Sequence, residues 1–241
     1  MASGKNIIEV NMYREIIEKV KKIVDVMAFI LLILYMGVGI TGEENHELIG
    51  LSLISLFIFH AILNFDWFIS VKNNMFRSKS SLSDIFFFMI NLFIITVFVI
   101  FVISHIGASY KIFASFGIKK SRVYIFASEL SSLLLFILMG IQFGALKAKK
   151  GLFKNNKKAK ITAWVCILVL AFLGGNAMAR RDLSEKFTYY YDEKSETKVE
   201  EDYIGNLYLD YLLMTFVYFA IGYGMCVGAK KIDKSEELKG E

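Results

Sequence analysis

Six long stretches of apolar residues divide the chain, and the shorter stretches between them carry most of its charged residues. Each apolar stretch has close to the roughly 20 residues that a helix needs to cross a bilayer core. Backbone polar groups inside a bilayer must be hydrogen-bonded within the chain, which favours helices. The pattern therefore predicts an all-α, polytopic membrane helical bundle with six transmembrane helices, at about residues 23–40, 47–65, 85–107, 123–146, 161–179 and 207–229.

The first 22 residues have a different pattern, in which apolar residues recur at helical spacing among charged ones. This spacing predicts an amphipathic helix along the cytoplasmic membrane surface that leads into the first span. A helix that continues the first span into the cytoplasm fits the same pattern. We accordingly divide the chain into a cytoplasmic N-terminal helix, a four-helix membrane unit and two additional spans, at 1–22, 23–150 and 151–241.

Basic residues are distributed unevenly between the two sides of the predicted membrane. Of the 28 lysines and arginines, 19 lie on the side of the N-terminus and nine on the other side, which includes the loop 180–206. Lysine and arginine are enriched in cytoplasmic segments. This asymmetry predicts a multi-pass protein of a prokaryotic plasma membrane with both termini in the cytoplasm. The lysine-rich run at 147–160 is interpreted as a topology signal and a contact for anionic lipid, rather than as a nucleic-acid site.

Several classes of function are disfavoured by what the sequence lacks. The chain contains no proline, so the broken helices of many transporters would have to form at glycines alone. Cys166 and Cys226 lie in apolar stretches and are too few for a disulfide framework or an iron–sulfur cluster. We find no hydrolase, transferase or nucleotide-binding motif. An enzymatic role would at most be that of a redox electron-transfer subunit.

The three histidines are the main candidates for chemistry. His46 and His60 are fourteen residues apart, which is about four helical turns, so both lie on nearly one face, roughly 21 Å apart. Ionisable groups within a membrane helix are functional hypotheses by default. The spacing suits a helix that holds two hemes, one near each membrane surface. It equally suits one interfacial histidine and one histidine buried against a neighbouring helix.

Residues 23–150 resemble the flavinylation-associated cytochrome family of small prokaryotic membrane proteins. The resemblance rests on three blocks of residues: Thr41-Gly42 with His46-Glu47-Leu48-Ile49-Gly50, His60, Leu63-Asn64 and Trp67; Ile103-Ser104 with Ser109 and Phe113; and Leu138-Met139 with Gly144. It implies a four-helix, cytochrome-b-like core that holds heme b between its second and fourth helices. It also implies electron transfer to a flavin on an extracytoplasmic partner. His46 and His60 match the family's histidines on the second helix.

The chain departs from the family pattern at the remaining heme ligands. The histidines of the family's fourth helix fall on Ser128, Gln142 and Leu146, and a glycine of its third helix is replaced by His105. Ligation by histidines of helices two and four is therefore excluded. Because His46 and His105 both lie at outer ends of their spans, they form a candidate heme site. Alternatively, His105 is an interfacial histidine bonded to backbone or water. A metal site that adds Glu43, Glu44 or Glu47 to the two histidines is a further alternative.

Other polar residues in the spans also admit two interpretations. His60 either shares a heme with a methionine such as Met139 or hydrogen-bonds to Asn64 or Gln142. Three carboxylates near span ends either form part of an ion path or pair with nearby basic residues. The expected pairs are Asp66 with Lys72, and Glu129 and Asp210 with Arg122 or Arg180.

The leading functional prediction is an integral membrane electron-transfer subunit. It would be a divergent b-type cytochrome that works with an extracytoplasmic flavoprotein or a quinone. The sequence contains no flavin-attachment motif, so any flavin would belong to the partner. The alternative is a heme-free membrane scaffold or partner-binding subunit that retains the fold. A transporter has only the number of spans in its favour.

Overall fold

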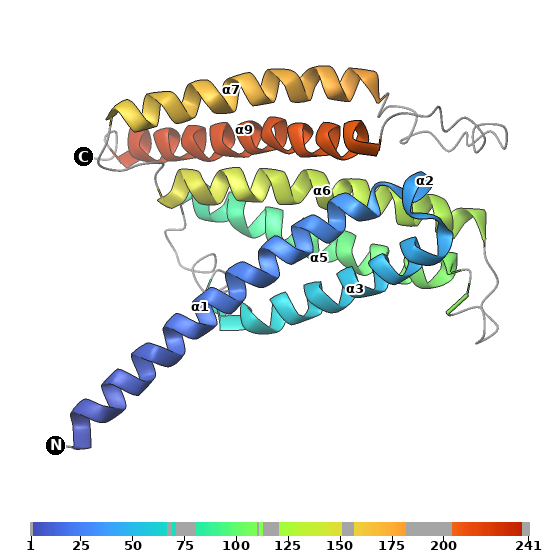
Figure 1. Ribbon diagram of the computed structural model, residues 1–241. Coiled ribbons are helices and arrows are strands. Elements are labelled where there is room, and N and C mark those ends of the chain that lie inside the picture. The colour runs from blue at the N-terminus through green and yellow to red at the C-terminus, as the bar shows by residue number, and fades with distance from the viewer. Residues whose placement is uncertain are drawn as a thin grey trace.

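The computed structural model describes residues 2–66, 69–70, 81–109, 111–112, 121–150, 157–181 and 204–237, and the regular structure in these ranges is entirely helical. Figure 1 shows the helices as elongated, roughly aligned rods. Their bounds are α1 (Ala2–Tyr35), α2 (Val38–Thr41), α3 (Glu43–Leu63), α5 (Leu82–Ala108), α6 (Arg122–Lys150), α7 (Lys157–Arg180) and α9 (Ile204–Glu237).

Five helices among the described residues, α3, α5, α6, α7 and α9, are long and apolar enough to cross a membrane. They correspond to the last five predicted spans. The first predicted span, 23–40, differs from the structure because its helix ends at Tyr35, where a turn at Met36 and Gly37 leads into the short α2. The uninterrupted apolar part of α1 is therefore shorter than predicted. Residues 2–22 and the apolar part belong to one continuous helix.

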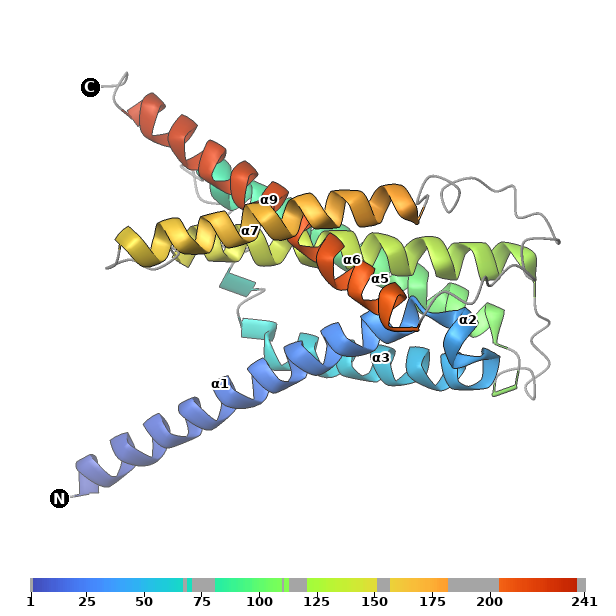
Figure 2. The same ribbon diagram turned by 45° about the horizontal axis from the view of Figure 1, so that its top comes forward.

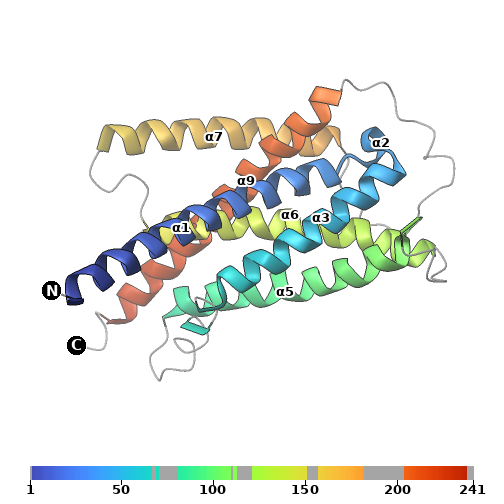
Figure 3. The same cartoon turned by 60° about the horizontal axis from the view of Figure 1, so that its bottom comes forward.

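Both chain termini lie at the same end of the bundle, which we call the terminal end (Figure 1). The opposite end, where α1, α5 and α7 finish, is called the distal end. From one side of the bundle to the other, α7 covers α9, α9 packs on α6, and α6 packs on α5. The hairpin of α1 and α3 covers the remaining side, and α3 runs between α1 and α5 (Figure 3). The bundle thus consists of α5, α6, α7 and α9 with the α1–α3 hairpin docked on it.

Glycines allow α6 and α9 to approach closely. A Cβ atom added to Gly144 would collide with the carbonyl oxygen of Phe219, and one added to Gly222 would collide with that of Ile141. Small residues at helix contacts are typical of membrane proteins, where van der Waals packing replaces the hydrophobic driving force. The contact between α6 and α9 therefore requires glycine at these two positions.

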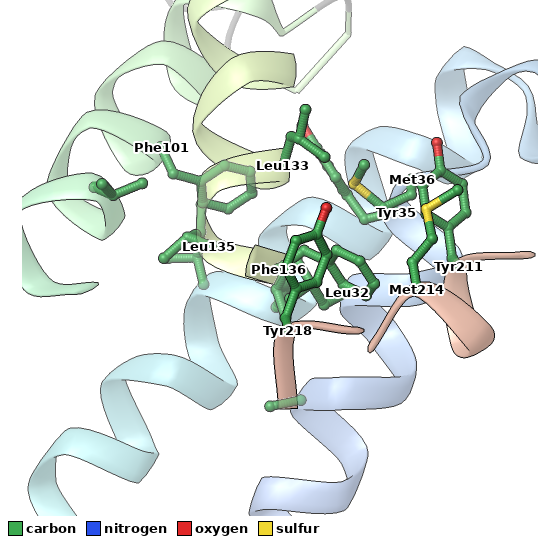
Figure 4. Close-up of a cluster of buried hydrophobic side chains, with 14 of the residues drawn as sticks. Leu32, Tyr35, Met36, Phe101, Leu133, Leu135, Phe136, Tyr211, Met214 and Tyr218 are labelled. Atoms are coloured by element: carbon green, nitrogen blue, oxygen red, sulfur yellow. The ribbon is translucent and has the colours of Figure 1, made fainter. Parts of the chain in front are cut away.

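A large apolar cluster joins α1 to the rest of the bundle in its distal half (Figure 4). Leu32 and Tyr35 of α1 lie in this cluster together with Phe136 of α6 and Tyr211 of α9. The ring of Phe136 meets the ring of Tyr211 edge to face, with centroids 5.8 Å apart. This packing fixes the last turn of α1, and so fixes the position of the Tyr35 side chain.

Polar contacts tie the helices together at both ends. At the terminal end, Asp233 of α9 accepts hydrogen bonds from the backbone N–H groups of Leu82 and Ser83, at 2.7 and 3.3 Å, which satisfies the free donors at the start of α5. At the distal end, the buried Asp210 of α9 pairs with Arg180 at 2.6 Å and Arg181 at 2.8 Å. The expected pair of Asp210 with Arg180 is thus present. Lys72, the expected partner of Asp66, lies outside the described residues.

Candidate functional site

Four side chains from four helices meet at the distal end, and we call them the distal polar cluster: Tyr35 of α1, His46 of α3, His105 of α5 and Ser128 of α6. The ring of Tyr35 stacks on the ring of His46, with centroids 4.0 Å apart and planes 29° apart. The Tyr35 hydroxyl lies 2.7 Å from Ser128 Oγ and 3.0 Å from His105 Nδ1. One tyrosine therefore contacts the other three members of the cluster.

The turn that leads into α3 places His46 opposite α1. Gly42 precedes α3 with a φ of 75°, a left-handed conformation that favours glycine. This turn and the short α2 reverse the chain, so that the first turn of α3 lies beside the last turn of α1. The sequence Thr41-Gly42 therefore has a conformational role in bringing His46 to Tyr35.

His105 is almost fully buried, and both of its ring nitrogens have partners. Its Nε2 lies 3.3 Å from the backbone oxygen of Glu47, and its Nδ1 faces the Tyr35 hydroxyl. Because a carbonyl can only accept, we assign the ring proton to Nε2. Nδ1 then accepts from the Tyr35 hydroxyl, which in turn accepts from Ser128. The hydrogen bonds run in one direction from Ser128 to the Glu47 carbonyl.

Gly50 provides the space in which the His105 ring lies. A Cβ atom at Gly50 would collide with the His105 ring atoms Cε1 and Nε2. On another side, the Phe101 ring stacks on the His105 ring at a centroid distance of 5.6 Å. The imidazole is thus enclosed between α3 and its own helix, with its orientation fixed by packing and by its hydrogen bonds.

Glu47, one residue after His46, anchors the segment that follows α5. Its buried carboxylate accepts hydrogen bonds from the Ser109 hydroxyl and from the backbone N–H groups of Lys111 and Ile112, the latter two at 3.0 and 2.9 Å. Nearby, Glu44 bonds the Lys111 amino group at 2.8 Å, which raises the pKa of that amine. The two glutamates therefore hold the residues that directly follow α5 against the start of α3.

The site shows no arrangement suited to a metal ion. In the part of the chain that the structure describes, no three His, Cys, Asp or Glu side chains come close enough to share a metal. The Glu47 carboxylate is already engaged by Ser109 and two backbone groups. The geometry of Glu47 therefore does not support a metal site in which glutamates join His46 and His105.

The cluster as it stands also does not fit a heme between His46 and His105. The two rings are 6.5 Å apart between centroids, with planes 63° apart, but Tyr35 contacts both. A heme iron needs a free nitrogen on each axial histidine, whereas both nitrogens of His105 are hydrogen-bonded. Heme would require Tyr35 to leave its place and His105 to lose one hydrogen bond.

His60 lies far from this cluster, near the other end of α3. Its Nδ1 is 2.6 Å from the carboxylate of Asp25 on α1, and both side chains are about half exposed. The Asn64 amide lies 3.4 Å from both ring nitrogens. Of the alternatives expected for His60, Asn64 is thus a neighbour. Gln142 instead donates to Asn91 of α5 at 2.8 Å, and Met139 packs against the large apolar cluster.

The three positions at which the predicted resemblance places heme-ligating histidines have separate environments here. Ser128 belongs to the distal polar cluster, Gln142 joins α6 to α5 through Asn91, and Leu146 packs against buried Phe87, Ala145 and Cys226. Two of the three replacements therefore form interhelical hydrogen bonds, and the third contributes to apolar packing.

Tyr35 and Asp25 are the residues that sequence reasoning missed. A tyrosine at the end of an apolar run is typical of the aromatic belt at the membrane interface, so Tyr35 carried no distinct signal. Asp25 is a single carboxylate within an apolar run, which could have been recognised as a residue in need of a partner. Comparisons of the chain with family models, with curated proteins and with solved structures gave no match.

Proposed function

We propose that this protein is a heme-free integral membrane subunit that retains a cytochrome-like four-helix core as a scaffold for a partner protein. The observation that carries the proposal is the position of Tyr35, whose ring covers His46 and whose hydroxyl joins His105 to Ser128. Ser128 stands where the resembled family has a heme ligand. In this proposal, the distal polar cluster joins the helices that heme joins in the family.

The chemistry of the cluster supports a structural role. Hydrogen bonds between membrane helices contribute about 0.6 kcal/mol each on average, and the Ser128–Tyr35–His105 chain connects α6, α1 and α5. The hydrogen bond from His105 to the Glu47 carbonyl also connects α3 to this group of helices. All four helices of the core are therefore linked through protein groups alone.

The proposal includes the six-span topology with both termini in the cytoplasm. In it, the apolar part of α1 crosses the membrane beside α3, with Asp25 and His60 paired near the cytoplasmic surface. The common position of the two termini at one end of the bundle (Figure 1) and the excess of lysine and arginine on that side support this orientation.

Heme-independent stability tests the proposal. The protein is produced in heme-deficient cells and in heme-supplied cells, and the midpoint of thermal unfolding is measured in the same detergent. A scaffold that needs no cofactor should give the same midpoint in both preparations. A bound ligand stabilises only the folded state that binds it, so a higher midpoint in the heme-supplied preparation would contradict the proposal.

A divergent b-type cytochrome is the second candidate, and one observation favours it. Nδ1 of His46 is a buried side-chain atom without a hydrogen-bond partner in the described part of the chain. Buried polar groups are rarely left unpaired in native structures, and a ligand is one means of satisfying them. In this candidate, His46 would be a heme ligand and the partner would be a flavoprotein or a quinone. An absorption spectrum distinguishes the two candidates.

A further inference from the structure

The N-terminal half of α1 carries apolar side chains that no other part of the described chain covers. It projects beyond the terminal end of α3 and away from the bundle (Figures 1 and 2). Met12, Tyr13, Ile16 and Ile17 are all exposed there. Isolated exposed apolar residues are ordinary, but a contiguous apolar patch marks an interaction site.

Seven apolar residues of α1 follow a heptad spacing. Intervals of three and four residues alternate without interruption along one stripe of the helix, which we call the α1 stripe: Tyr13, Ile16, Val20, Ile23, Met27, Ile30 and Leu34. Five of these seven side chains are between 49% and 67% exposed. Apolar residues sustained at this spacing over three heptads are the pattern of a helix that packs against another helix.

The opposite face of α1 is already occupied by the rest of the chain. Val24, Ala28 and Leu32 are buried, and α3 is the main neighbour of α1. The charged residues near the stripe avoid its seven positions: Arg14, Glu15, Glu18, Lys19, Lys21 and Lys22 all lie between them. The helix thus has one face packed on its own bundle and a second apolar face that is largely exposed in the described part of the chain.

Lipid can cover only part of the α1 stripe. Lys21 and Lys22 mark the boundary of the apolar part, so Tyr13, Ile16 and Val20 lie beyond it. The helix contains no glycine or proline from Lys5 to Tyr35, and α1 continues through this region as one helix. In the proposed six-span topology, α1 crosses the membrane boundary without a turn. The stripe then continues into water, where its apolar surface favours a protein partner.

We propose that the α1 stripe is the self-association surface of this protein, occupied by the α1 stripe of a second copy in parallel orientation. Two copies in one membrane share the same orientation, so identical stripes meet in register. Five stripe side chains are between 49% and 67% exposed. They expose on the order of 500 Å² per copy, so two copies reach the roughly 1,000 Å² in total that a specific interface needs.

Cysteine crosslinking of the full-length protein in isolated membranes tests this proposal. Cys166 and Cys226 are first replaced by serine and alanine, and single cysteines are then introduced by Ile16→Cys and Val20→Cys on the stripe. Glu18→Cys, on the opposite face, is the matched control. Oxidation should give at least about five times more disulfide-linked dimer at the stripe positions than at the control. Equal crosslinking at all three positions, or none on the stripe, would overturn the proposal.

A second substitution separates a specific contact from random collision. Ile16→Glu, combined with Val20→Cys, should reduce dimer formation at least about fivefold, because it places a charge within the apolar stripe. Arg14→Glu introduces the same side chain off the stripe and should leave crosslinking unchanged. If the stripe cysteines fail to crosslink while a fluorophore attached to them is quenched by spin-labelled lipid, the membrane surface covers the stripe, and the proposal is wrong.

Discussion

At the scale of single residues, Tyr35 has the largest influence on the candidate site. Its ring lies on His46, while its hydroxyl is placed between a serine and a histidine on two other helices. The hydroxyl serves both as donor and as acceptor, which no phenylalanine could do. Without it, Ser128 and His105 Nδ1 would lose their shared partner in a buried environment, where unpaired polar groups are costly.

Tyr35→Phe should therefore lower the free energy of unfolding while preserving the apolar packing of the ring. We expect a loss of about 1–2 kcal/mol, the range for one lost partner of buried polar groups. Unfolding in detergent, followed by circular dichroism, measures the change. Tyr124→Phe, at an exposed position of α6, is the matched control and should have no effect. Equal stability of Tyr35→Phe and the parent would show that the hydrogen-bond chain contributes nothing.

At the scale of helices, the apolar pattern predicted their positions well and their ends less well. The stretch 123–146 lies within α6 (Arg122–Lys150), and 207–229 lies within α9 (Ile204–Glu237). Hydropathy marks the part of a helix suited to lipid, whereas the helix continues into flanking charged residues that are good helix formers. The stretch 23–40 was predicted too long, because composition did not reveal the turn after Tyr35.

Contacts between helices could be predicted only in part. His46 and His105 both lie near the distal ends of their helices, and their similar depth followed from the sequence. The partners of Tyr35 and Asp25 could not be predicted from the sequence, because they depend on how each helix is rotated about its axis. That rotation is set by packing between helices, including the close approach at Gly50 and Gly222, which a single sequence does not specify.

The glycine contact between α6 and α9 gives a prediction at this scale. Gly222→Ala should destabilise the protein by about 1–3 kcal/mol, because the added methyl group meets the backbone of Ile141 in a tightly packed interface. Gly224→Ala, two residues away in open space, should be neutral or stabilise the helix by up to about 1 kcal/mol. Thermal unfolding of the two variants side by side provides the comparison, and equal midpoints would contradict the tight contact.

At the scale of the whole molecule, the described residues form a helical bundle in which five helices are suited to a membrane. The α1–α3 hairpin packs less extensively on α5, α6 and α9 than these three helices and α7 pack on one another. The hairpin contacts the rest of the bundle through the large apolar cluster and the distal polar cluster. The proposed topology places this distal end outside the cell and the projecting part of α1 in the cytoplasm.

Accessibility of the loop 180–206 tests that topology. In a chain without its native cysteines, Ser195→Cys should react with a membrane-impermeant maleimide added to intact cells. Glu18→Cys, at an exposed position of α1, should react in the same background only after the cells are permeabilised. The reverse pattern of labelling would show that the orientation is inverted, and labelling of both cysteines in intact cells would exclude six spans.

The absence of heme is the central claim, and an absorption spectrum of the purified protein tests it most directly. The protein is produced with ample heme supply, and a reduced-minus-oxidised spectrum is combined with a chemical heme assay per mole of protein. We predict no Soret or α-band and a heme content far below one per chain, because Tyr35 covers His46 and both nitrogens of His105 are bonded. A b-type spectrum at one heme per chain or more would contradict the account and establish the cytochrome function instead.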